Sequence, residues 1–122
     1  EKPFTPINTL TETQADEKWF NRLNEIIQEN ISNTEFSVDQ LTRSVNMSRT
    51  LLYAKVKAVT GLTPNEFIRL VRLRKAAEYL AGNEYKINEI CYMVGFNSPS
   101  YFAKCFQNQF GVLPKDFINN TN

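Results

Sequence analysis

Basic side chains gather in one stretch of this chain, where they could bind a polyanion. Residues 43–75 carry eight lysines and arginines and a single acid, Glu66. Guanidinium and ammonium groups donate hydrogen bonds to phosphate oxygens, and a local excess of them attracts nucleic acid. The net charge of the whole chain is only +1, because residues 1–40 carry eight acidic and three basic side chains. The pattern favours nucleic-acid binding, with an ordinary solvated face as the alternative.

Side chains suited to catalysis or metal binding are scarce. The chain has no histidine, the commonest general base and metal ligand. Its two cysteines, Cys91 and Cys105, have a spacing that fits neither a zinc site nor a disulfide framework, so we expect them to be ordinary helix residues. The sequence also lacks paired carboxylates and a phosphate-binding loop. We therefore expect no enzymatic activity, no metal, no cofactor and no small-molecule ligand.

The sequence carries no signal for export or for crossing a membrane. No apolar run approaches the roughly 18 to 20 residues that span a bilayer, and the first residues lack the pattern of a signal peptide. We expect a cytoplasmic protein, with the cytoplasmic end of a membrane-anchored sensor as a variant of that location. Two prolines among the first six residues are typical of a linker cut from a larger protein.

Residues 37–68 and 86–118 repeat one pattern. Three apolar positions recur at an offset of 49 residues, and seven further positions recur at an offset of 50. The extra residue falls in a turn, where an insertion is tolerated because turns are exposed. The matched pairs are Val38 with Ile87, Leu41 with Ile90, Val45 with Val94, Ser48 with Ser98, Leu52 with Phe102, Val56 with Phe106, Gly61 with Gly111, Pro64 with Pro114, Phe67 with Phe117 and Ile68 with Ile118.

Each copy is predicted to form a short helix, a tight turn and a longer helix, which is the helix-turn-helix layout. Ser37 and Gln40 can form a capping box at the start of the first short helix. Ser48 and Ser98 are expected to cap the longer helices, because a serine hydroxyl accepts a hydrogen bond from a free N–H group there. Gly95 is expected to take a positive φ in the second turn. The expected core residues of the second copy are Phe96, Phe102, Phe106 and Phe110.

A long helix is predicted to connect the two copies. Thr63, Pro64 and Glu66 are suitable for its start and Gly82 for its end. A further amphipathic helix is expected over residues 16–31, and no strand pattern persists, so the fold class is all-α with about seven helices. The predicted divisions are a linker (1–15), a first helix-turn-helix subdomain (16–62), a connecting helix (63–82), a second helix-turn-helix subdomain (83–118) and a disordered tail (119–122).

The stretch INEICYMVGFNSPSYFAKCFQNQFGVLPKDF resembles the signature of the DNA-binding domain of AraC/XylS-family transcription regulators in order and spacing. The first copy, with MSRTLLYAKVKAVTGLTPNEFIRLVRLRKAAEYL, resembles the C-terminal output domains of hybrid sensor-kinase and response-regulator proteins. The resemblance covers about residues 16–118. It implies a bacterial activator of transcription, whose partners are double-stranded DNA, RNA polymerase and a second copy held through upstream domains.

The resemblance also implies which residues meet DNA. The two longer helices would enter successive segments of the major groove, with exposed residues of their first turns against the bases. The implied base-contacting residues are Arg49, Thr50, Tyr53, Ala54, Pro99, Ser100, Ala103 and Lys104. The implied phosphate-contacting residues are Ser48, Lys55, Lys57, Arg69, Arg72 and Ser98.

The second copy departs from the family pattern. Gln107 and Asn108 follow Phe106 where many relatives carry basic residues, and Ser100 and Ala103 are small, so direct readout by this copy looks thin. A different class of function therefore stays open, in which the chain is a helical protein-interaction module that has lost its DNA contacts.

Overall fold

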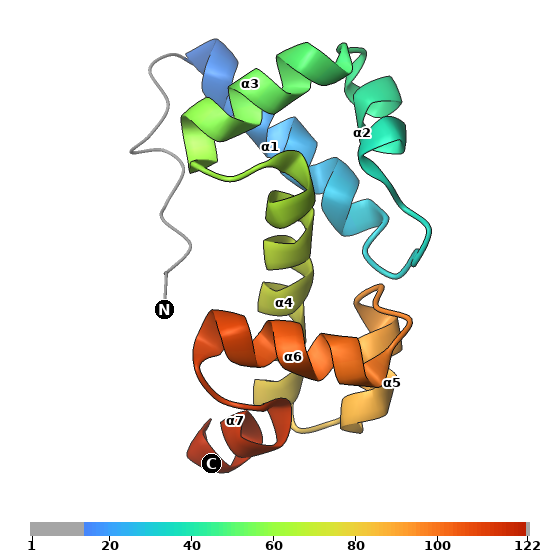
Figure 1. Ribbon diagram of the computed structural model, residues 1–122, viewed down its shortest axis with the longest axis vertical. Coiled ribbons are helices and arrows are strands. Elements are labelled where there is room, and N and C mark those ends of the chain that lie inside the picture. Colours follow the sequence, from blue (N-terminus) through green and yellow to red (C-terminus); the bar gives the residue numbers. More distant parts are fainter. Residues whose placement is uncertain (1–13, 122) are drawn as a thin grey trace. The chain divides into compact units, whose positions relative to one another are not determined.

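The computed structural model describes residues 14–121, and the side chains of residues 15–118. In this part of the chain every regular element is a helix, which confirms the predicted all-α class (Figure 1). The helices are α1 (Gln14–Glu29), α2 (Val38–Val45), α3 (Arg49–Thr60), α4 (Pro64–Gly82), α5 (Ile87–Met93), α6 (Pro99–Phe110) and α7 (Pro114–Thr121).

The helix starts follow the predicted caps. The hydroxyl of Ser48 accepts a hydrogen bond from the Leu51 N–H at 3.1 Å, and that of Ser98 accepts one from the Tyr101 N–H at 3.2 Å. Ser37 and Gln40 form the expected capping box at the start of α2. Each cap satisfies an N–H group that has no partner within its own helix, and so fixes where the helix begins.

The turn inside each helix-turn-helix requires a left-handed backbone. Gly95 has a φ of +91°, as predicted, and Asn46, 49 residues earlier in the first copy, has a φ of +56°. Asparagine tolerates this conformation better than most residues other than glycine. The two turns therefore share a left-handed backbone conformation, but a different residue adopts it in each.

The described chain divides into two compact units, each with its own core. Residues 14–30 and 36–69 form the N-terminal unit, and residues 31–35 and 70–121 form the C-terminal unit. The division falls within α4, whereas we had expected the connecting helix to stand between two subdomains. Residues 31–35 follow α1 in the sequence but belong to the C-terminal unit.

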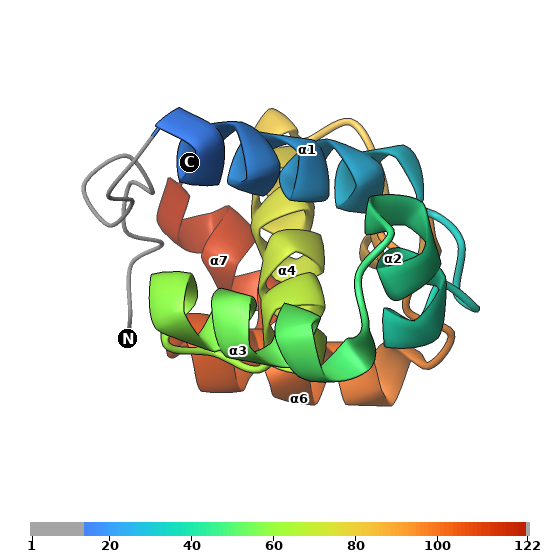
Figure 2. The same cartoon turned by 90° about the horizontal axis from the view of Figure 1, so that it is seen from above.

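The core of the N-terminal unit is formed by α1, α2, α3 and the start of α4 (Figure 2). The rings of Phe20 and Phe67 meet edge to face with their centroids 5.3 Å apart. Leu41 from α2 and Leu52 from α3 are fully buried. Burying such side chains is the main stabilising contribution to a helical unit of this size.

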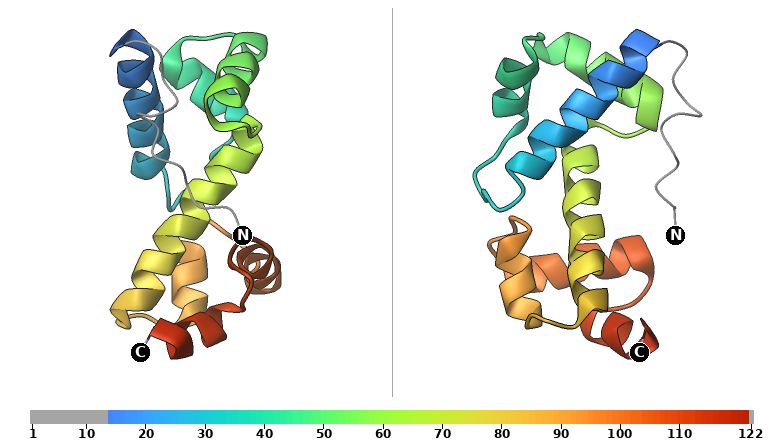
Figure 3. Two further views of the ribbon diagram at one scale, coloured as in Figure 1. Left: turned by 90° about the vertical axis from the view of Figure 1, so that its left-hand side faces the viewer. Right: turned by 180° about the vertical axis from the view of Figure 1, so that it is seen from behind.

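The core of the C-terminal unit is formed by α5, α6 and α7 against the later part of α4 (Figure 3). Phe102 and Phe106 are fully buried with ring centroids 5.9 Å apart, and Phe96 is only 7% exposed. Phe110 is partly buried and packs against the same cluster. The predicted aromatic stripe of α6 is thus confirmed as core.

Helix α4 ends at Gly82, as predicted, and the residue after it, Asn83, takes the left-handed conformation with a φ of +56°. Two other expected boundaries differ from those in the structure. Helix α7 continues to Thr121, so the backbone of residues 119–121, expected to be a disordered tail, is helical. Helix α1 begins at Gln14, two residues before the predicted start, and the rest of the predicted linker lies outside the described residues.

The two cysteines are free thiols buried in the C-terminal unit, as expected for ordinary helix residues. Burial raises the pKa of the Cys91 thiol. None of the helices in the described part of the chain is both long enough and apolar enough to span a membrane.

Candidate nucleic-acid interface

The first two turns of α3 present the predicted base-contacting residues to solvent. Arg49, Thr50, Tyr53 and Ala54 are all exposed. Thr50 and Ala54 lie on the face of the helix opposite Leu52 and Val56, which are buried in the core. The exposed face combines a guanidinium, a hydroxyl, a phenol and a methyl group. These groups can form hydrogen bonds with base edges or contact a thymine methyl.

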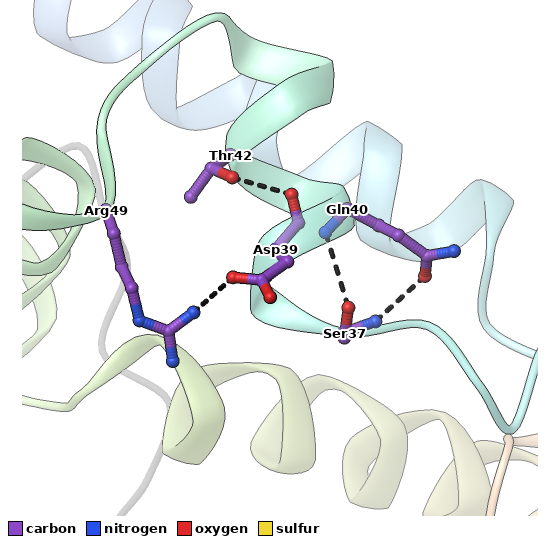
Figure 4. A network of polar contacts seen from close by, with 5 residues as sticks. All are labelled: Ser37, Asp39, Gln40, Thr42 and Arg49. Atoms are coloured by element: carbon purple, nitrogen blue, oxygen red, sulfur yellow. Dashed lines mark hydrogen bonds and ion pairs between the residues drawn. The ribbon is translucent and has the colours of Figure 1, made fainter.

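Arg49 has a partner that the sequence did not indicate. Its Nη1 atom donates to Oδ1 of Asp39, in the first turn of α2 (Figure 4). The Arg49 side chain is 55% exposed and the Asp39 side chain 67% exposed. The contact thus links the first turns of the two helices of the N-terminal helix-turn-helix.

Lys55 is held against α1 and is only half-exposed. Its Nζ lies 3.6 Å from a carboxylate oxygen of Asp16 and 4.7 Å from the ring centroid of Trp19. The Trp19 Nε1–H in turn donates to the sulfur of Met47 at 3.0 Å. These contacts give Lys55 a structural role in the N-terminal unit besides the predicted phosphate contact.

Lys57 and Arg69 lie near the acidic residue Glu66 of the N-terminal unit. The Thr63 backbone N–H lowers the pKa of the Glu66 carboxyl most strongly, and the charges of Lys57 and Arg69 lower it further. Lys57 is exposed, whereas Arg69 is partly buried. Of the two, Lys57 is the more accessible to a phosphate.

Helix α6 presents a surface with less charge. Ser100 and Lys104 are exposed, Pro99 and Ala103 are partly buried, and Lys104 is the one charged side chain of this helix. Ser98 shares a hydrogen bond of 3.2 Å with Ser100 besides capping the helix. By contrast, α3 carries Arg49, Lys55 and Lys57, so the two helices differ in their capacity for polar contacts with DNA.

Two exposed residues at equivalent positions were not predicted as contacts. Leu51 is 51% exposed and Tyr101, 50 residues later, is 50% exposed. Each is the third residue of its helix, next to the predicted base-contacting residues. The helical period could have revealed Leu51, because it shares a face with Lys55 and Ala58, away from Leu52 and Val56.

The structure overturns the prediction that Arg72 contacts a phosphate. Arg72 is only 7% exposed, and its Nη1 donates to the carbonyls of Ile31 at 2.7 Å and Val94 at 2.8 Å. Its Nη2 donates to the carbonyl of Asn33 at 3.1 Å. Burial lowers the pKa of the guanidinium. Arg72 therefore connects α4, the 31–35 segment and the end of α5 within the C-terminal unit.

No metal centre accompanies these surfaces in the part of the chain that the structure describes. Groups of three or more histidine, cysteine or acidic side chains that could hold an ion are absent from residues 14–121. What the exposed faces of α3 and α6 offer is a set of hydrogen-bond donors, methyl groups and positive charges. That chemistry is suited to a nucleic acid.

The paired short and long helices define a helix-turn-helix protein. A family model described as a helix-turn-helix domain matches residues 41–120, well over half of the chain. The chain belongs to the AraC-type helix-turn-helix family, as the resemblance in its second copy had indicated.

Curated relatives share this sequence over most of its length. Histidine kinase P4 of Formosa agariphila is 41% identical over 118 residues, which cover 97% of this chain and 8% of the kinase. The HTH-type transcriptional regulator MtrA of Neisseria gonorrhoeae is 34% identical over 98 residues, which cover 79% of this chain and 33% of MtrA. The chain thus spans a third or less of the length of these relatives.

Solved structures share the fold. A transcriptional regulator from Chromobacterium violaceum, described as containing an AraC-type DNA-binding domain, superposes with a TM-score of 0.80 at 22% identity, covering 89% of this chain and 96% of that one. The DNA-binding domain of the global transcriptional factor AdpA, solved in complex with a target DNA, superposes with a TM-score of 0.72 at 24% identity. The match covers 81% of this chain and 91% of that one. Both likenesses cover more than three quarters of this chain.

Proposed function

We propose that this chain is the DNA-binding output domain of a bacterial transcription regulator and reads a specific duplex sequence through α3 and α6. The observation that carries the proposal is the exposure of Arg49, Thr50, Tyr53 and Ala54 on the first turns of α3, directly after the Ser48 cap. A helix-turn-helix places this part of its second helix against base edges in the major groove. Membership of the AraC-type family supports the same function.

Each exposed group of α3 has a role in this proposal. Arg49 donates to the O6 and N7 atoms of a guanine, while Thr50 and Ala54 contact thymine methyl groups. Tyr53 contacts a base edge through its exposed phenol. Lys57 neutralises a phosphate, and Lys55 assists with the part of its ammonium group that Asp16 leaves accessible. The backbone N–H groups near Ser48 add a phosphate anchor at the helix start.

Helix α6 reads the adjacent groove segment with fewer contacts. Lys104 donates to a guanine or to a phosphate, and Ser100 contacts a base edge through its hydroxyl. Pro99 and Ala103 make close apolar contacts, and the helix start at Ser98 binds a phosphate. Most of the discrimination between sequences then comes from α3.

The wider context is proposed from the relatives. Because a histidine kinase and transcription regulators contain similar sequences, we propose that this chain serves a two-component protein as its non-enzymatic output, in the cytoplasm. Pairing of two copies through upstream domains would strengthen binding, since linked sites raise the effective concentration of the second. Activation would then follow from contact with RNA polymerase.

A second candidate function is a protein-interaction module. The observation that favours it is the exposure of aromatic rings on the C-terminal unit, where Tyr92 is 49% and Tyr101 50% exposed. Exposed tyrosines are common at protein interfaces. This candidate requires no contact of α3 with bases.

The deciding experiment is selection of the 122-residue chain against random duplex DNA, followed by titration across salt concentrations. The expected result is a bipartite motif with halves about one helical turn apart and an affinity that falls steeply with salt. If nothing is enriched at low salt, even from a chain fused to a dimerising segment, the DNA-binding proposal fails and the interaction module replaces it.

A further inference from the structure

The ion pair between Asp39 and Arg49 joins two residues whose backbones are each fixed by a helix cap. Asp39 is the second residue of α2, after the capping box of Ser37 and Gln40, and the Thr42 hydroxyl donates to its carbonyl at 2.6 Å (Figure 4). Arg49 is the first residue of α3, directly after the Ser48 cap. The carboxylate of Asp39 therefore stands at a defined position beside the first turn of α3.

The ion pair contributes little to the stability of the fold. Both side chains are more than half exposed, and ion pairs in that setting contribute little to folding because water screens them. A carboxylate in the first turn of α2 is already favourable through the helix dipole, whether or not Arg49 is present. The distinctive effect of the contact is on where the Arg49 guanidinium is held.

The contact leaves Arg49 able to bind a base. Nη1 faces Asp39, whereas a guanidinium has five N–H donors arranged as a planar fork. A free arginine side chain samples many rotamers and loses that freedom when it binds. An arginine already held at one nitrogen loses less, and its plane is oriented before DNA arrives.

We propose, on the basis of the DNA-binding function above, that Asp39 is a positioning residue that makes Arg49 selective for a base. It orients the guanidinium for two donors to meet a guanine. Its negative charge also disfavours a phosphate at the Arg49 guanidinium itself, so Arg49 is kept from binding the DNA backbone without regard to sequence. Specificity gained by such a repulsive element lowers binding to incorrect sites as well as favouring the correct one.

The test measures discrimination and not affinity alone. Four proteins are titrated, namely the wild-type chain, Asp39→Asn, Asp39→Glu and Glu25→Gln. Each is titrated with the selected duplex and with duplexes in which the base pair read by Arg49 is replaced. Glu25 is a matched control, because it is an exposed acid of the same unit, paired with Arg22, and its substitution changes the net charge equally. Asp39→Asn is expected to reduce the ratio of correct to incorrect affinity roughly five- to tenfold, while binding to incorrect duplexes tightens.

Three comparisons separate a positioning role of Asp39 from a structural one. Asp39→Glu keeps the charge and should recover much of the discrimination, and Glu25→Gln should leave the ratio unchanged. In an Arg49→Ala background, Asp39→Asn should no longer affect the ratio, because the group it positions is gone. Thermal unfolding of each variant shows whether the fold is intact.

Defined results would overturn the inference. If Asp39→Asn lowers affinity for correct and incorrect duplexes by the same factor, or still alters discrimination without Arg49, Asp39 does not act through Arg49. If the wild-type chain and its dimerised form select no duplex, the proposed function itself fails and this inference fails with it. If the wild type binds selectively and Asp39→Asn leaves the ratio of correct to incorrect affinity unchanged, the proposed function stands and only this inference fails.

Discussion

The Arg72 guanidinium fills the space into which a side chain at Gly95 would project. A Cβ atom at Gly95 would overlap Nη1 of Arg72 and press on the carbonyl of Ile31. Glycine is thus required at this position for two reasons, the φ of +91° and the close approach of the arginine. The turn of the C-terminal helix-turn-helix and the buried arginine of α4 form one structural feature.

Replacing this glycine should damage the C-terminal unit. Gly95→Ala is expected to lower the free energy of unfolding by roughly 3 kcal/mol, from the strained positive φ together with displaced Arg72 hydrogen bonds. Gly61→Ala is the matched control, because Gly61 has a φ of +76° but open space around the added Cβ. It should cost only about 1 kcal/mol. Denaturant titration measures both, and equal losses would show that the contact with Arg72 contributes nothing.

Removing the buried guanidinium should destabilise the protein without altering its phosphate contacts. Arg72→Met leaves three carbonyl groups without their donor, and we expect a loss of roughly 3 kcal/mol in the free energy of unfolding. The dependence of DNA affinity on salt, measured where the variant is folded, should keep its wild-type slope.

Lys57→Ala should behave in the opposite way to Arg72→Met. Lys57 is exposed on α3, so its loss should leave unfolding nearly unchanged and reduce the salt slope by about one. A slope that also falls by one in Arg72→Met would mean that the guanidinium leaves its buried site and reaches a phosphate.

Arg49→Ala should weaken binding to the selected duplex by roughly 1 to 3 kcal/mol if Arg49 reads a base. The loss should be confined to one base position, at which the variant no longer prefers guanine. Titrations against single-substituted duplexes would show this. Uniform weakening at all positions would instead assign Arg49 to a phosphate.

The start of α4 should weaken in acid. The Thr63 N–H, above all, stabilises ionised Glu66 and lowers its pKa in the folded state. This stabilisation is complete above the ordinary glutamate pKa of 4.5 and is lost as the pH falls through the lowered folded value. In Glu66→Gln the capping contact persists without a titrating group. Thermal unfolding should therefore show less acid sensitivity in this variant, and equal sensitivity would assign the effect to other carboxylates.

The fold was largely predictable because its signals are local. Ser37, Ser48 and Ser98 cap helices through N–H groups three residues away, and the internal repeat sets the order of the elements. Helix α4 ends at Gly82, as predicted, but the left-handed residue at its end is Asn83 and not the glycine. Asparagine tolerates the left-handed conformation, but a glycine directly before it makes the glycine the expected residue for that conformation.

The surface of α3 was predictable from helical phase, but its partners were not. Asp39 lies ten residues from Arg49, and Arg72 binds carbonyls 22 to 41 residues away, so both contacts depend on tertiary packing. One signal for Arg72 was present, since it lies four and eight residues before the buried Ala76 and Leu80. A basic residue on an apolar helix face indicates a buried partner.

Each unit contains a side chain that can report on its unfolding, a fluorescent one in the N-terminal unit and reactive thiols in the C-terminal unit. Its single tryptophan, Trp19, belongs to the N-terminal unit, where its indole contacts Met47 and the ammonium of Lys55. Both cysteines are buried in the C-terminal unit. Tryptophan fluorescence therefore follows the opening of one unit, and the rate of thiol labelling follows that of the other. Comparing them would show, in the unmodified protein, whether the two helix-turn-helix copies unfold together or one at a time.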